Sequence, residues 1–133
     1  MIELGIQKFL LADATLTGLV GTGVFNGRMD KETLPAVVIQ VISSTEQQQY
    51  HLGPVGSRMK RIQIDTYAND YFDAQRINDR VIALLDGYSG TLPDNTVVDA
   101  ACLDNEMDLP VEAGFQGYLC RRMAEFCITY QLQ

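Results

Sequence analysis

Hydrophobic and polar residues alternate along residues 61–68 and change to helical spacing over residues 70–86. In the first segment every second residue is apolar or small, as in a strand with one buried face: Ile62, Ile64, Thr66 and Ala68. In the second, apolar residues recur every three or four positions: Ala74, Ile77, Val81, Leu84 and Leu85. Asp70 suits the N-cap of this helix and Gly87 its end. We therefore predict a strand followed directly by an amphipathic helix.

The N-terminal third shows helical spacing first and a strand pattern later. Residues 2–12 place apolar side chains on one helical face: Ile2, Ile6, Phe9, Leu10 and Ala14. A short second helix is predicted over residues 15–20, ended by Gly21 and Gly23. A short strand is predicted over residues 24–28, and the β-branched run 36–42 predicts a well-buried strand.

The remaining strands are expected in pairs. Residues 36–42 and 58–68 predict a long hairpin whose tip is the polar, glycine-bearing stretch 46–56. Two more strands are predicted over about 96–106 and 118–132. In the last, one face comprises Arg122, Ala124, Phe126, Ile128, Tyr130 and Leu132. We predict one α+β domain over residues 1–133: an N-terminal helix and a mostly antiparallel sheet of four to five strands in two hairpins, with the central helix packed on one face.

Composition narrows the possible functions. The chain has 133 residues and a formal net charge of −7, whereas a surface that grips nucleic acid needs clustered Lys and Arg. Its longest apolar runs are far shorter than a membrane-spanning helix, and its N-terminus lacks the basic start of a signal peptide. Three cysteines without a CxxC pair favour a reducing, intracellular compartment and free thiols.

Three carboxylates stand at alternate positions of a predicted strand, namely Asp104, Glu106 and Asp108. A regular strand would place all three on one face. They suit either a divalent metal ion or a solvated or interfacial acidic edge, and we favour the second interpretation because runs of charge usually lie at the surface.

Other candidate chemistry is weaker. His51 is the only histidine and has no nucleophile pattern near it. The thiols of Cys102, Cys120 and Cys127 lack the close pair typical of zinc sites. The basic cluster Arg58, Lys60 and Arg61 suits a solvated strand or a subunit contact. We therefore predict that the protein is not an enzyme and uses no cofactor or metal.

Several local sequences follow one another along nearly the whole chain: Phe9-Leu10-Leu11-Ala12-Asp13 and Leu19-Val20-Gly21, then Leu34-Pro35-Ala36-Val37-Val38, then residues 61–68, then Ala83-Leu84-Leu85-Asp86-Gly87, then residues 103–109, and finally Arg121-Arg122 before Phe126-Cys127-Ile128-Thr129-Tyr130. This order resembles the tail-completion or tail-terminator proteins of long-tailed bacteriophages.

The resemblance implies a structural virion protein of the tail or neck, assembled in the host bacterial cytoplasm. Such proteins form a homo-oligomeric ring, usually of six subunits, that caps the head-proximal end of the tail tube and joins it to the head–tail connector. DNA passes through the lumen without specific binding, and no membrane is involved. The alternatives are a head-closure or other neck protein, and a small α+β enzyme or ligand-binding domain with a pocket between helix 70–86 and the sheet.

A ring of this kind needs two different surfaces on each subunit. The charge asymmetry between the basic cluster and the acidic strand predicts where neighbours meet, together with the hairpin tip. The expected assembly contacts are Gln47, Gln48, Gln49, Tyr50, His51, Leu52, Arg58, Lys60, Arg61, Asp104, Glu106 and Asp108.

Overall fold

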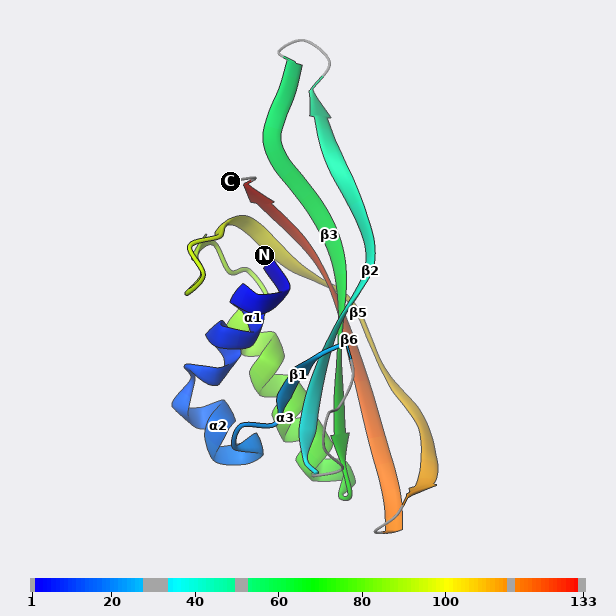
Figure 1. The fold of residues 1–133 in the computed structure, drawn as a ribbon. Helices are drawn as coiled ribbons and strands as arrows, with labels where there is room; N and C mark the ends of the chain where they lie inside the picture. Colours follow the sequence, from blue (N-terminus) through cyan, green and yellow to red (C-terminus); the bar gives the residue numbers. More distant parts are fainter. Residues whose placement is uncertain (1, 28–33, 50–52, 115–116, 132–133) are drawn as a thin grey trace.

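A computed structural model describes residues 2–27, 34–49, 53–114 and 117–131; the side chains of residues 43–57 and 109–119 lie outside the description. Its helices are α1 (Ile2–Leu11), α2 (Ala14–Val20) and α3 (Tyr71–Leu85). Its strands are β1 (Val24–Asn26), β2 (Ala36–Gln49), β3 (Gly53–Ala68), β4 (Gly90–Thr91), β5 (Val97–Gly114) and β6 (Gly117–Gln131). The helices lie on one side of a long, twisted sheet, and hairpins β2–β3 and β5–β6 extend from opposite ends of the body (Figure 1).

The strands form one sheet in the order β1-β2-β3-β6-β5-β4. Strand β1 runs parallel to β2, and the other neighbours are antiparallel. The predicted α+β class, the two hairpins and the mostly antiparallel sheet are confirmed. The described sheet has six strands rather than four or five, because β4 contains only Gly90 and Thr91 and is too short to show alternation.

The core lies between the helices and one face of the sheet. The predicted alternation of β3 and β6 is confirmed there, since five apolar side chains of the predicted faces are at most 1% exposed: Ile62, Ile64, Ala124, Phe126 and Ile128. They pack against equally buried helix residues, namely Ile2, Ile6 and Leu10 of α1 and Ile77, Val81 and Leu85 of α3.

Caps fix where the helices begin and end. The Asp70 carboxylate accepts a hydrogen bond from the Asp73 amide at 3.2 Å, as predicted for an N-cap. Gly87 follows α3 with a φ of 79°, a conformation that favours glycine. The Gly87 amide donates to the Ala101 carbonyl at 2.7 Å. The Asp86 carboxylate accepts from the Leu103 amide at 2.9 Å, so the end of α3 is tied to β5.

Candidate assembly surface

Strand register brings the basic cluster and the acidic strand together within one chain. Arg61 of β3 lies opposite Cys127 of β6, and β5 is the next strand beyond β6. The Arg61 guanidinium reaches across β6 and donates to Asp104, and it lies 3.4 Å from a Glu125 oxygen. Hydrogen bonding to Asp104, together with the charge of that carboxylate, raises the pKa of Arg61.

The expectation that the three carboxylates share one face is wrong. The β5–β6 register shifts between Leu103 and Asn105, so Asp104 occupies a bulge. A bulge adds one residue and breaks the alternation of side chains. Asp104 therefore contacts Arg61 on the face away from the helices, whereas Glu106 accepts a hydrogen bond from Asn78 of α3 on the helix face.

A second ionic group lies on the helix-covered face of the sheet. Arg122 of β6 donates to Asp108 and lies 3.4 Å from a Glu106 oxygen. The Tyr71 hydroxyl donates to Asp108 at 2.8 Å. The hydrogen bond from Tyr71 and the bond from Arg122 lower the pKa of Asp108, although partial burial opposes the shift. Asn78 Nδ2 donates to Glu106 at 3.3 Å, so α3 and β5 share a polar contact.

The rest of the basic cluster lies at the upper end of the body. Lys60 Nζ lies 2.5 Å from a Glu3 oxygen of α1 and 5.9 Å from the centre of the Tyr130 ring. Arg58 is half-buried and lies opposite Tyr130 in the β3–β6 ladder. Lys60 and Arg61 are therefore paired within their own chain.

These pairs leave an excess of negative charge on β5 and β6. Each of the two ionic groups has two carboxylates and one guanidinium. Asp104 and Glu125 lie beside Arg61, and Glu106 and Asp108 lie beside Arg122. The β5 carboxylates are partly exposed, at 47% for the Asp104 side chain and 44% for that of Asp108. The excess is divided between the two faces of the sheet, and on each face it repels a phosphate backbone and attracts cationic groups.

The other predicted contact residues fall on the β2–β3 hairpin. Residues 47–49 belong to β2, but the side chains of Gln47, Gln48 and Gln49 lie outside the description. Tyr50, His51 and Leu52 lie outside the described residues altogether. Their role in assembly stays a prediction.

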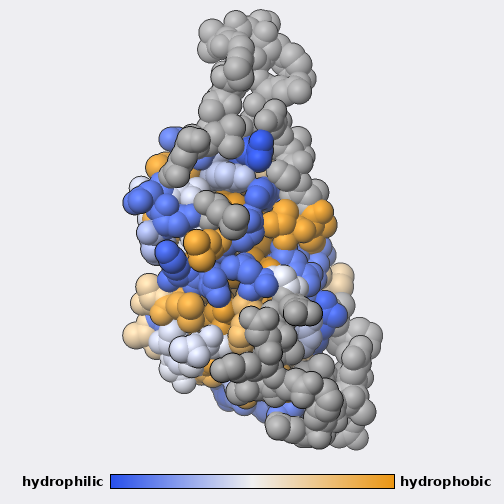
Figure 2. Space-filling model, in the orientation of Figure 1, coloured by the Kyte–Doolittle hydropathy of each residue, from blue (hydrophilic) through white to orange (hydrophobic). Residues whose placement is uncertain are grey.

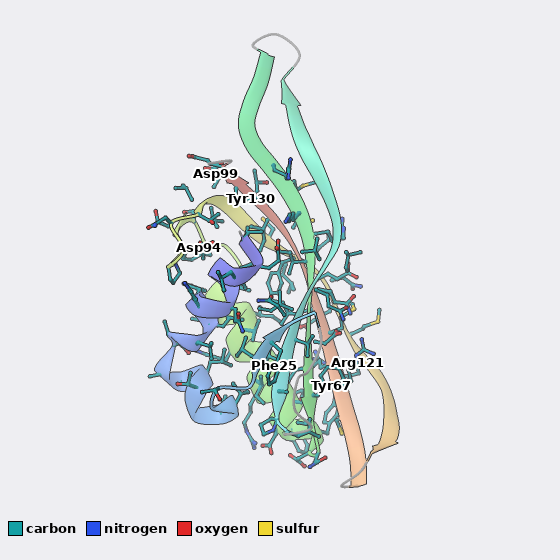
Figure 3. All side chains as sticks on the ribbon, viewed as in Figure 1. Phe25, Tyr67, Asp94, Asp99, Arg121 and Tyr130 are labelled. Atoms are coloured by element: carbon teal, nitrogen blue, oxygen red, sulfur yellow. The ribbon has the colours of Figure 1, made fainter. Side chains whose placement is uncertain are left out.

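One buried charge was not predicted from the sequence. Asp65 is fully buried although it occupies a polar position of the β3 alternation. Its carboxylate accepts from Arg121 at 2.8 Å and from Gln63 at 2.9 Å. The Arg121 guanidinium also lies 5.3 Å from the centre of the Tyr67 ring, and Figure 3 shows these two side chains together on the sheet. Only the register with β6 places Arg121 there, so the sequence of β3 alone gives no signal.

A second unpredicted ion pair joins the helices. The Asp13 carboxylate accepts from Arg80 of α3 at 2.7 and 2.9 Å, and from the Leu16 amide at 2.8 Å as the N-cap of α2. The hydrogen bonds from Arg80, together with the Leu16 amide, lower the pKa of Asp13 against the opposing effect of burial. The cap position of Asp13 is visible in the sequence, but its partner 67 positions away is not.

The sequence predicts three free thiols and, as an alternative, a ligand pocket between helix 70–86 and the sheet. Cys102, Cys120 and Cys127 are free, and no group of metal-binding side chains occurs within the described residues. The space between α3 and the sheet is filled by packed side chains such as Ile77. An open groove of about 490 Å³ lies elsewhere, where β1 ends, lined by Glu3, Asn26, Gly27, Ile39, Gln40 and Val41. Its lining offers one carboxylate and no histidine, cysteine or hydroxyl nucleophile.

Hydrophilic and hydrophobic residues are interspersed on the face of the molecule that Figure 2 shows. Hydrophilic residues run across the body in Figure 2, and hydrophobic residues show at several separate places. None of the described helices is long and apolar enough to cross a membrane.

Comparison with known families decides the kind of protein. The profile of a family described as tail completion protein gp17 matches residues 5–109. The chain belongs to the tail completion protein gp17 family. It is accordingly a structural protein of a phage tail, as the resemblance implied. The matched region contains most of α1, all of α2 and α3, the first four strands and most of β5.

A solved structure supports the fold of this tail completion protein. A chain in the virion of a native gene transfer agent (GTA) particle has a TM-score of 0.71 and 15% sequence identity, with 98% of this chain and 94% of that chain covered. The TM-score establishes a shared fold, and at this low identity the comparison shows the fold alone. A comparison with curated proteins finds no match.

Proposed function

We propose that this tail completion protein forms a closed ring, most simply of six copies, on the head-proximal end of the tail tube. The ring stops further polymerisation of the tube protein and presents a surface to the head–tail connector. The membership of the tail completion family carries the proposal. DNA passes through the lumen without specific binding, and the virion is the protein's final location.

The shape of the subunit supports a ring. Hairpins β2–β3 and β5–β6 extend from opposite ends of the helix-covered body (Figure 1), so one subunit offers different surfaces to two neighbours. Head-to-tail contact between different surfaces is the arrangement that closes rings. Leu4 of α1 is 39% exposed, and this helix is our candidate for the apolar part of the contact.

Charge supports a directional contact. Strand β5 carries excess carboxylates, while Arg58 and Lys60 lie on β3, which is separated from β5 by β6 in the sheet. Exposed charges of this kind contribute mainly partner specificity and association rate. Because Lys60 is paired with Glu3, a neighbour's carboxylate must share or replace that partner.

The experiment measures the growth of tail tubes. The cognate tube protein is polymerised with and without this protein, and tube length, end structure and bound mass are followed by electron microscopy and native mass spectrometry. Rings at one tube end and arrest of growth at that end are expected. Unchanged growth with binding only to the isolated connector would instead establish the head-closure alternative.

The interface assignment has a matched control. Reversal of Arg58 and Lys60 to Glu is expected to weaken ring formation strongly at low salt and less at high salt. The exchange Lys60→Glu with Glu3→Lys keeps the intrachain pair and still reverses the charge on β3. Equal assembly of parent and both variants at low salt contradicts this interface and leaves the ring itself untouched.

A further inference from the structure

Two cysteines lie directly opposite each other in the middle of the β5–β6 hairpin. The register pairs Cys102 with Cys127, between the pairs Ala101–Ile128 and Leu103–Phe126. Side chains of directly opposed residues in an antiparallel pair point to the same face. Cys102 is exposed and Cys127 is half-buried, and both are free thiols.

The backbone spacing of such a pair suits a disulfide. Opposed residues in antiparallel strands have Cα atoms about 4.5 or 5.5 Å apart, depending on the hydrogen-bonding pattern. Disulfides occur at Cα separations of about 4.4 to 6.8 Å. Both Cα spacings lie within this range, so the two sulfur atoms can meet by side-chain rotation and a small local adjustment of the strands.

The third cysteine is excluded by its position. Cys120 stands seven residues before Cys127 on the same strand and points to the opposite face. It is buried with Ala68 and Ala74, next to α3. The pair Cys102–Cys127 is thus the combination that the fold permits within one chain.

We infer that Cys102 and Cys127 form a redox-sensitive modification site, at which a low-molecular-weight disulfide such as oxidised glutathione closes a cross-strand bond between β5 and β6. The exposed Cys102 sulfur attacks the glutathione disulfide, whose S–S bond breaks and releases one glutathione thiol. The Cys127 sulfur then attacks the resulting mixed disulfide and releases the second glutathione. Two protein thiols are oxidised, one glutathione disulfide is reduced, and the two thiol protons pass to the released glutathione molecules.

The inference goes beyond the proposed function and depends on it only for timing. In the reducing cytoplasm of the host the thiols stay free, and the bond forms once the particle is exposed to oxidising surroundings. The bond restrains the unfolded chain and holds the long β5–β6 hairpin in its register. The bond therefore stabilises the folded protein once it has formed.

The test uses the purified, folded protein and oxidised glutathione. After oxidation, intact mass spectrometry is expected to show the loss of two hydrogen atoms. Alkylation with N-ethylmaleimide in denaturant, which exposes the buried Cys120, is expected to fall from three adducts to one. Peptide mapping is expected to identify the Cys102–Cys127 link, and the midpoint of thermal unfolding is expected to rise and to return on reduction.

Variants separate the proposed pair from other thiol chemistry. Cys120→Ser is expected to cross-link as the parent does, whereas Cys102→Ser and Cys127→Ser are expected to lose the link. A parent that keeps stable glutathione adducts, links two chains through Cys102, or pairs through Cys120 overturns the inference. Because the decisive mapping is done on the parent protein, a variant that fails to fold does not weaken the test.

Discussion

The central strands present Ile62 and Phe126 to the helices on one face of the sheet, each fully buried, and Arg61, Asp65 and Glu125 on the other. The first face is held by apolar area, in proportion to what is removed from water. The second is held by ion pairs between strands. Arg61 of β3 reaches across β6 to Asp104 of β5, and Asp65 of β3 pairs with Arg121 of the neighbouring β6. An apolar side chain is buried whenever it points to the helix-covered face, whereas an ion pair forms only if the strand register places its two partners side by side. Substitutions on the two faces should therefore differ in size and in their dependence on salt and pH.

The largest effect is expected on the helix-covered face. Phe126→Ala removes a fully buried ring from the centre of the core. We expect the free energy of unfolding to fall by about 3–5 kcal/mol, from lost transfer energy and the cavity left behind. Equilibrium urea unfolding of the monomer measures it. Phe72→Ala is the matched control, because Phe72 is 61% exposed, and a comparable loss there would contradict the assignment of the core.

A smaller effect is expected at the buried carboxylate of the other face. Asp65→Ala removes the acceptor of the bonds from Arg121 and Gln63. We expect a loss of about 2 kcal/mol, as for hydrogen bonds to charged groups. The double variant with Arg121→Ala should lose less than the sum of the single variants. Additive losses would show that Asp65 and Arg121 are not coupled. Asp99→Asn, at an exposed carboxylate, serves as the control.

Phe126 and Asp65 show which features of the fold could be predicted from the sequence and which could not. The alternation of β3 and β6 and the cap at Asp70 were predicted because each depends on residues close together in the chain. The burial of Asp65, the bulge at Asp104 and the ion pair between Asp13 and Arg80 were not, because each depends on register or packing between distant segments. The strands also run further into both hairpins than predicted, since backbone pairing continues where apolar alternation has ended.

Substitutions of Asp13 separate its contribution as the N-cap of α2 from the contribution of its charge. Asp13→Ala should lower the free energy of unfolding by about 1 kcal/mol through loss of the N-cap alone, with the pair to Arg80 lost in addition. Asp13→Asn keeps a good cap and loses only the charge. Thermal unfolding at neutral pH is expected to rank the parent first, Asp13→Asn second and Asp13→Ala third. Equal stability of the two variants would mean that the cap contributes nothing.

The same residue predicts a pH dependence. Because Arg80 and the Leu16 amide lower the pKa of Asp13 in the folded protein, its contribution is fully present above the ordinary aspartate pKa of about 3.9. It is lost as the pH falls through the lowered pKa, where the folded state also takes up the proton. Asp13→Asn should therefore reduce the dependence of stability on pH below about 4. Asp73→Asn, at an exposed pair within α3, is the control variant.

The smallest effect on the free energy of unfolding is expected at Arg61, in the exposed ion pair on the face away from the helices. Its side chain is 36% exposed and pairs with Asp104, which is 47% exposed, and water and salt screen such pairs. Arg61→Lys keeps the charge but loses the planar group that lies between Asp104 and Glu125. We expect a small loss of stability at low salt that disappears at high salt, measured by urea unfolding at both. Arg76→Lys, in an exposed pair with Asp73, is the control. If the loss of stability at Arg61 persists at high salt, packing rather than charge stabilises this face. The two faces would then not differ in the kind of interaction that stabilises them.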